Sequence, residues 1–183
     1  MKFVIAITGA SGVIYGIRLV EELKKKGNFI YLIISDTAKK IIGEETQYRI
    51  QEIEKKADRT YNENDINAEI ASGSAEYDAM VICPCSGKTL SAIANGLAIN
   101  LIIRSAICCL KEGRKLILVP RETPLDAISL ENMLKLSRTG VTILPAMPAF
   151  YIKPKSVDDM INFITGKVMD QLGIKNDLYK RWK

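Results

Sequence analysis

Short apolar runs, each about the length of one β-strand, recur along the chain and alternate with amphipathic segments of helical period. The runs cover residues 3–7, 29–34, 79–83, 116–119 and 141–144. Each run is continuous rather than alternating, which is typical of strands that are buried on both faces of a sheet. The pattern therefore predicts a parallel sheet of five strands that is covered by helices on both faces.

Helical patterns occupy the segments between these runs. They cover residues 15–23, the segment that begins at 35–38, the segment that ends at 93, and residues 101–110, 130–136 and 157–172, the last opened by Ser156 as its cap. Residues 45–78 are polar, so we expect an irregular excursion there with one short strand. Loops of this length in compact domains tend to be functional. The predicted fold is an α/β, single-domain, Rossmann-like three-layer sandwich over residues 1–183.

Composition narrows the classes of partner. The chain is 48% hydrophobic, but it has no apolar stretch of the roughly 20 residues that a membrane span needs, and no secretory leader pattern. We therefore expect a cytoplasmic protein without a membrane partner. The net charge of +5 is spread along the chain, and its densest run, residues 24–26, falls at the end of a predicted helix, where cations complement the helix dipole. Nucleic acid is not predicted as a partner.

The chain contains no histidine, which excludes Ser-His-Asp and Cys-His catalysis as well as histidine metal sites. Acid–base chemistry is left to Glu, Asp, Lys and Tyr side chains or to a phosphate of the ligand. The four cysteines, Cys83, Cys85, Cys108 and Cys109, lack zinc-site spacing, and we expect buried thiols. No metal is predicted.

The first strand ends in Thr-Gly-Ala-Ser-Gly at residues 8–12. Gly9 and Gly12 allow the backbone to approach a ligand closely, and Ser11 with the N–H groups of the next helix offers donors to a phosphate. The spacing is neither that of a dinucleotide fingerprint nor that of a nucleotide-hydrolysing P-loop. An ordinary strand-to-helix turn remains the alternative.

Hydroxyls, small residues and charges follow the other strands as well. They are Ser35 after the second strand, Ser86, Gly87, Lys88 and Thr89 after the third, Arg121 and Glu122 after the fourth, and Tyr151 after the fifth. Ligands of parallel sheets bind beyond the carboxyl ends of the strands, so we expect a pocket there for a phosphorylated small molecule. Each hydroxyl alone could be a helix cap, and Arg121 with Glu122 could be a plain ion pair.

Taken together, the motifs resemble the UbiX-type flavin prenyltransferases, a family within the flavin-containing cysteine-decarboxylase-like proteins. The resemblance is carried by residues 8–12, 15–18, 72–74, 81–86, 88–90, 121–125, 130–134, 148–151 and 181–182. It implies two substrates, reduced FMN and dimethylallyl monophosphate. It also implies metal-free transfer of the dimethylallyl group to N5 and C6 of the flavin, with the product serving UbiD-type decarboxylases.

The resemblance implies roles for individual residues. FMN is expected at Gly9, Ala10, Ser11, Ser35, Ser86, Gly87, Lys88, Thr89 and Arg121. The prenyl phosphate is expected at Tyr151, Lys167, Lys111 and Arg121, and the catalytic residues are expected to be Glu122, Glu45, Tyr151 and Lys111. Asp126 and Ser129 stand where the family commonly has His, and Lys167 stands where Arg is frequent.

The family implies a homo-oligomer, expected to be a dodecamer. The long polar loop and the tail that ends in Trp182 are the expected contact surfaces, because an exposed Trp on a short tail is a common interface anchor. Two other functions remain open at this stage. An FMN-dependent cysteine decarboxylase would need a His base, which this chain lacks. A non-catalytic flavin carrier would bind FMN without turnover.

Overall fold

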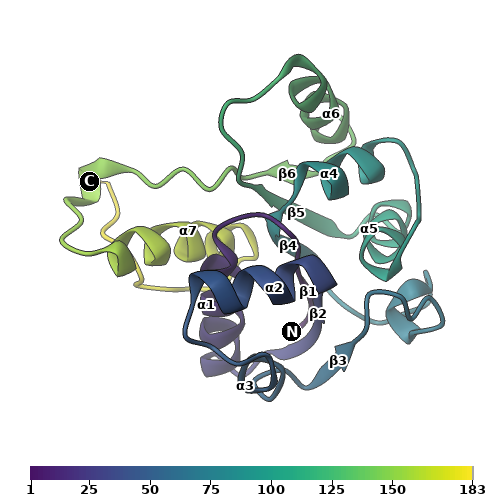
Figure 1. Cartoon of the computed structure of the whole chain (residues 1–183), viewed down its shortest axis with the longest axis horizontal. Coiled ribbons are helices and arrows are strands. Elements are labelled where there is room, and N and C mark those ends of the chain that lie inside the picture. Colours follow the sequence, from purple (N-terminus) through teal and green to yellow (C-terminus); the bar gives the residue numbers. More distant parts are fainter. Residues whose placement is uncertain (183) are drawn as a thin grey trace.

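The computed structural model describes residues 1–182, and within them six parallel strands form one sheet in the order β3-β2-β1-β4-β5-β6 (Figure 1). The strands are β1 (Lys2–Ile7), β2 (Phe29–Ile34), β3 (Arg59–Tyr61), β4 (Ala79–Cys85), β5 (Lys115–Pro120) and β6 (Thr142–Ile143). The strand order reverses between β1 and β4, which pair in parallel. This is the doubly wound order whose ligands bind at the reversal point.

Helices cover both faces of the sheet. They are α1 (Val13–Lys25), α2 (Asp36–Glu45), α3 (Ile50–Glu54), α4 (Gly87–Ala94), α5 (Leu101–Lys111), α6 (Ala127–Ser137) and α7 (Val157–Gln171), with short 3-10 helices η1 (Glu69–Ala71) and η2 (Phe150–Ile152). The apolar faces of α1, α2, α3 and α7 pack on one side, while η1, α4, α5 and α6 pack on the other. After β6 an extended segment leads away from the sheet to η2 and α7 (Figure 1).

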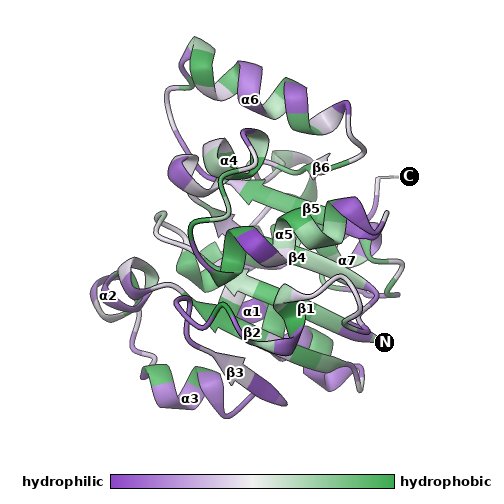
Figure 2. Ribbon diagram, turned by 90° about the vertical axis from the view of Figure 1, so that its right-hand side faces the viewer, coloured by the Kyte–Doolittle hydropathy of each residue, from purple (hydrophilic) through white to green (hydrophobic). Residues whose placement is uncertain are grey.

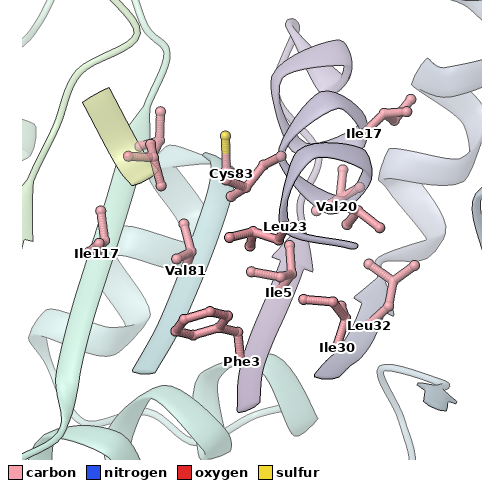
Figure 3. Packing of buried hydrophobic residues seen from close by; sticks show 14 of the residues in the cluster. Phe3, Ile5, Ile17, Val20, Leu23, Ile30, Leu32, Val81, Cys83 and Ile117 are labelled. Carbon is pink, nitrogen blue, oxygen red and sulfur yellow. The ribbon is translucent and has the colours of Figure 1, made fainter. Parts of the chain in front are cut away.

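Alternate strand residues supply the two halves of the core. Phe3 and Ile5 of β1 face the α1 and α7 side, whereas Val4 and Ala6 face the α4 and α5 side. Figure 3 shows Ile5 beside Leu23 of α1, and the hydropathy colours of Figure 2 show that β1, β2, β4 and β5 are apolar along most of their length, whereas β3 is polar. Burial on both faces explains why the sequence has continuous apolar runs instead of alternating ones.

The structure confirms the predicted sandwich and the single short strand in residues 45–78, which is β3. It differs from the predictions at several boundaries. The third strand continues to Cys85, β6 has only two residues, and α3 lies in the excursion where no helix was predicted. Helix α6 begins earlier than predicted, because the carboxylate of Asp126 caps it, accepting from Ser129 N at 3.0 Å and from Ser129 Oγ at 2.7 Å.

All four cysteines are free and buried, as predicted. Burial raises the pKa of the Cys83 and Cys85 thiols far above the usual range, so both stay protonated and unreactive at neutral pH. Among residues 1–182, none of the helices has both the length and the apolar character that crossing a bilayer requires.

Candidate active site

A cavity of about 450 Å³ opens at the carboxyl ends of the strands, where the strand order reverses. It is lined by Thr8, Gly9, Ala10, Ser11, Ser35, Thr37, Ile41, Glu63, Ser86, Gly87, Lys88, Thr89, Asn100, Ile102, Arg121 and Glu122. All nine residues that the sequence predicted for FMN are in this set. The loops after four different strands therefore meet in one place, as the parallel topology requires.

The loop after β1 forms one wall of the cavity. Thr8 Oγ1 donates to the carbonyl of Pro84 at 2.8 Å and accepts from Ser86 N at 2.8 Å, so it ties the end of β1 to the end of β4. A Cβ atom on Gly9 would lie 2.5 Å from Thr37 Cγ2. Position 9 therefore has room for glycine only, and its bare backbone faces the cavity.

The predicted hydroxyls of Ser35 and Ser86 are both helix caps and cavity residues. Ser35 Oγ accepts from Ala38 N at 3.1 Å, and Ser86 Oγ accepts from Thr89 N at 3.3 Å. These caps place the N-termini of α2 and α4 at the cavity, and helix N-termini attract anions. A capping serine oxygen only accepts from the helix, so the O–H of Ser35 can still donate to a ligand. Ser86 Oγ instead donates to Thr89 Oγ1 at 3.0 Å, which leaves the Thr89 hydroxyl as the donor of this pair.

Arg121 and Glu122 follow β5 at the floor of the site. Arg121 Nε donates to the carbonyl of Ser11 at 3.3 Å, which joins the β5 exit to the β1 loop. Glu122 Oε1 accepts from Thr123 N at 3.1 Å. Within residues 1–182 the side chains of Arg121 and Glu122 form no ion pair with each other. The alternative interpretation, that they only pair with each other, is therefore wrong. Both charged groups are available to a ligand.

The sequence did not predict Glu63 or Asn100 as site residues. Glu63 Oε1 accepts from Asp36 N and its Oε2 accepts from Asn100 Nδ2, each at 2.7 Å. The carboxylate thus bridges the start of α2 and the start of α5 at the cavity. Asn100 is the N-cap of α5, and its position just before an apolar helical pattern was an available signal. Glu63 lies in the polar excursion, where no pattern marks it.

Glu45 does not line the cavity but contacts its first loop. It is the last residue of α2, and its Oε2 accepts from Gly12 N at 2.8 Å. Gly12 has φ +92°, a left-handed conformation that favours glycine. Nearby, burial raises the pKa of Tyr15, with Cys83 adding to the shift and Arg121 opposing it.

The other three predicted residues lie outside the cavity of their own chain. Tyr151 is in η2 and packs against Phe163 of α7, with ring centroids 5.9 Å apart. Lys167 is half-buried on α7. Lys111 is the last residue of α5, and the first turn of this helix lies at the cavity. Lys111 is therefore about 16 Å further along the helix axis, towards the end of the sheet that is away from the cavity.

Over residues 1–182 no group of three or more His, Cys, Asp or Glu side chains is arranged to hold a metal ion. The donor groups of the cavity are hydroxyls, backbone N–H groups, a lysine and an arginine. Such donors suit a phosphorylated organic ligand.

The comparison with known proteins decides the family. The Flavoprotein family matches residues 1–169. The flavin prenyltransferase UbiX of Methanocaldococcus jannaschii is 56% identical over 182 residues, an alignment that covers 100% of this chain and 98% of the relative. The chain belongs to the UbiX flavin prenyltransferase family. The family predicted from the motifs is therefore confirmed.

Solved structures agree with this assignment. A dodecameric FMN-dependent UbiX-like decarboxylase from Escherichia coli O157:H7 superposes with a TM-score of 0.98 at 44% identity, covering 100% of both chains. AnUbiX (PadA1), solved in complex with FMN and dimethylallyl pyrophosphate, has a TM-score of 0.98 at 41% identity and covers 100% of this chain and 97% of its own. The Rossmann-like flavoprotein fold is confirmed along the whole chain.

Proposed function

We propose that this chain transfers the dimethylallyl group of dimethylallyl monophosphate to N5 and C6 of reduced FMN, without a metal. The observation that carries the proposal is the convergence of nine predicted FMN residues on one cavity at the strand-order reversal. Related proteins of the same family are named flavin prenyltransferases, and one of them was solved with FMN and a dimethylallyl phosphate compound.

The cavity fits FMN in size and chemistry. Its volume of about 450 Å³ lies within the range of sites for small organic ligands. The N-termini of α2 and α4 suit the phosphate, and Ile41 and Ile102 offer apolar surface to a flat ring system. The absence of a Cβ at Gly9 leaves the backbone free to approach the ligand.

Reduced FMN, when bound, supplies the nucleophilic N5 and C6 positions that form bonds to the prenyl carbons. The chain has to stabilise the phosphate that leaves with the electron pair of the broken C–O bond. Arg121 can do this, because its guanidinium lies at the cavity and can bind a phosphate through two N–H groups. Glu122 lies next to it as the acceptor for a proton displaced from the ring.

Tyr151, Lys167 and Lys111 are proposed to bind the phosphate of the prenyl donor. Lys111 is about 16 Å along α5 from the cavity of its own chain, so we infer that it acts in the site of a neighbouring subunit. The dodecameric relative supports a homo-oligomer. Sites shared between subunits follow from this placement, and each then needs at least two copies of the chain.

The destination of the product and the cellular location remain predictions. We propose that the prenylated FMN is passed to a UbiD-type decarboxylase, as the family implies. We also propose a cytoplasmic location, which the four free cysteines support, because free thiols persist in reducing compartments.

The deciding experiment is an anaerobic incubation of the purified protein with reduced FMN and dimethylallyl monophosphate, without added metal. The flavin is released by denaturation, and its mass is measured by mass spectrometry. A parallel incubation uses dimethylallyl diphosphate as the donor. We expect a gain of one C5H8 unit with the monophosphate. Flavin that co-purifies but never gains mass with either donor would identify a flavin carrier and overturn the proposal.

A further inference from the structure

The C-terminal tail, residues 174–182, folds back along α7. Asn176 Nδ2 donates to the carbonyl of Gly166 at 3.2 Å. The ring of Tyr179 lies directly over Gly166, where a Cβ atom would be only 2.5 Å from Tyr179 Cδ1. Gly166 thus provides the gap that lets the tail sit against the helix, one residue before the predicted substrate-binding Lys167.

Asp170 of α7 is the acceptor that holds this tail. Its carboxylate accepts from Asn176 Nδ2 at 2.9 Å, from the hydroxyl of Tyr179, and from Arg181 through Nη2 at 2.8 Å and Nη1 at 3.1 Å. Its side chain is only 19% exposed. A two-pronged guanidinium contact to a sheltered carboxylate is among the stronger polar contacts in proteins.

The charge of Asp170 is maintained by these donors. Burial acts to raise its pKa, but the hydrogen bonds from Arg181, Tyr179 and Asn176 outweigh burial and lower the pKa below its usual value. In turn, burial and the Asp170 carboxylate raise the pKa of Tyr179 to about 12, so the phenol keeps its proton to donate.

The tail contacts the proposed prenyl-phosphate residue Tyr151. The ring of Trp182 meets that of Tyr151 edge-on, with centroids 5.2 Å apart and planes at 90°. Tyr151 also packs edge-on against Phe163, whose ring centroid lies 5.0 Å from that of Tyr179. Tyr151 therefore has one aromatic neighbour on helix α7 and one on the tail, and release of the tail removes the second of these contacts.

We propose that Asp170 is a positioning residue for prenyl-donor binding, which fixes the C-terminal tail so that Trp182 holds Tyr151 in its binding orientation. The inference rests on the proposed function, because it assigns Tyr151 to the donor phosphate. Asp170 itself does not line the flavin cavity. Its loss is therefore expected to affect the prenyl donor and to leave FMN binding unchanged.

Trp182 is the single tryptophan of the chain, so its fluorescence anisotropy reports directly on the tail. The test compares Asp170→Asn with the matched control Asp177→Asn, which makes the same change at an exposed tail residue. We expect a clear loss of Trp182 anisotropy and a donor affinity about tenfold weaker in Asp170→Asn only. Affinity is measured by calorimetry with dimethylallyl monophosphate on the FMN-loaded, assembled protein, and FMN affinity is measured separately.

A second variant keeps every charge. Gly166→Ala crowds Tyr179 from the helix side and should lower the Trp182 anisotropy and the donor affinity in the same direction. Unchanged anisotropy in both variants, or a mobile tail with wild-type donor affinity, would overturn the proposal. A wild-type protein that binds the donor without transferring it would overturn the proposed function alone, and one that does not bind the donor would overturn both.

Discussion

The backbone N–H of Gly12 donates a hydrogen bond of 2.8 Å to the Glu45 carboxylate, joining the flavin loop after β1 to the far end of α2. Glu45 thus acts on the cavity through the backbone of a loop that lines it. The contact makes two roles of the side chain separable: loop geometry needs a hydrogen-bond acceptor, whereas the catalytic role in proton movement that we propose for Glu45 needs a negative charge.

Substitution of Glu45 should separate these roles. Glu45→Gln retains an acceptor oxygen, so we expect FMN affinity within about twofold of wild type and turnover about tenfold lower. Glu45→Ala loses the acceptor and should also weaken FMN binding several-fold. Flavin titration and single-turnover mass kinetics measure the two effects, with the exposed neighbour Glu44→Ala as control. Wild-type turnover in Glu45→Gln would exclude the proton role.

Glu122→Gln should bind FMN normally and slow prenyl transfer by about 100-fold, which is the lower range for loss of a general base. We expect FMN binding to be retained because Glu122 lines the cavity but forms no ion pair with Arg121 in the described residues. The substitution therefore breaks no contact that positions Arg121. Rapid-quench mass spectrometry of the flavin measures the rate, and Glu131→Gln on the exposed side of α6 is the control. Unchanged prenylation removes Glu122 from the mechanism.

Gly9→Ala should lower FMN affinity by at least about tenfold, because the new Cβ would lie 2.5 Å from Thr37 Cγ2 and displace the loop or the start of α2. Gly43→Ala is a matched control in the exposed part of α2, where nothing lies within 4 Å of an added Cβ. It should keep FMN affinity and stabilise the fold by about 0.5–1 kcal/mol. Flavin titration and thermal unfolding test both variants, and equal FMN affinities would contradict the predicted clash.

Alkaline pH should destabilise the protein through Tyr77. Burial, with a smaller effect of Cys109, raises the pKa of Tyr77 from 10.0 to about 12, although Arg114 opposes the shift. The folded state therefore holds this proton more tightly than the unfolded state. The resulting stabilisation is complete below pH 10 and decreases as the pH rises from 10 towards about 12.

The Tyr77→Phe variant tests this assignment. Urea unfolding between pH 8 and pH 11 should give a flatter pH dependence for the variant than for wild type, apart from a constant loss from its bond to Ser105 O. Ionisation of the buried thiols at high pH also destabilises the folded state. Because both proteins contain these thiols, they do not affect the difference between the two pH dependences. Parallel curves would show that Tyr77 is not the titrating group.

The sequence predicted the strands well because burial on both faces leaves continuous apolar runs. It failed where tertiary contacts decide. Helix α3 has five residues with only Ile53 buried, so no periodic pattern can develop, and its start depends on Glu52 Oε2 accepting from Arg49 N at 3.1 Å. Strand β6 is shorter than its apolar run because only Thr142 and Ile143 are in register with β5 residues, although Leu144 N and Ala146 N still donate to the carbonyls of Leu118 and Pro120.

Site residues were predictable where they follow a buried strand directly, as Ser86 and Arg121 do. Glu63 was not predicted because it lies in the polar excursion. Its place at the cavity depends on hydrogen bonds to the N-termini of α2 and α5, which no local sequence pattern indicates. Lys111 illustrates the opposite limit. Its residue type was recognised by resemblance, but its distance from the cavity of its own chain appears only once the direction of α5 is known.

The two proposed substrates are served by different stretches of the chain. Every residue of the flavin cavity lies at or before Glu122, whereas Tyr151, Lys167 and the tail held by Asp170 lie after β6. Of the four residues proposed for the prenyl donor, Tyr151 and Lys167 thus lie in the last part of the polypeptide, whereas Lys111 and Arg121 precede β6. If the proposed donor residues are right, changes after β6 alter donor recognition without touching the flavin pocket, and an exchange of C-terminal segments between relatives is a direct route to altered donor specificity.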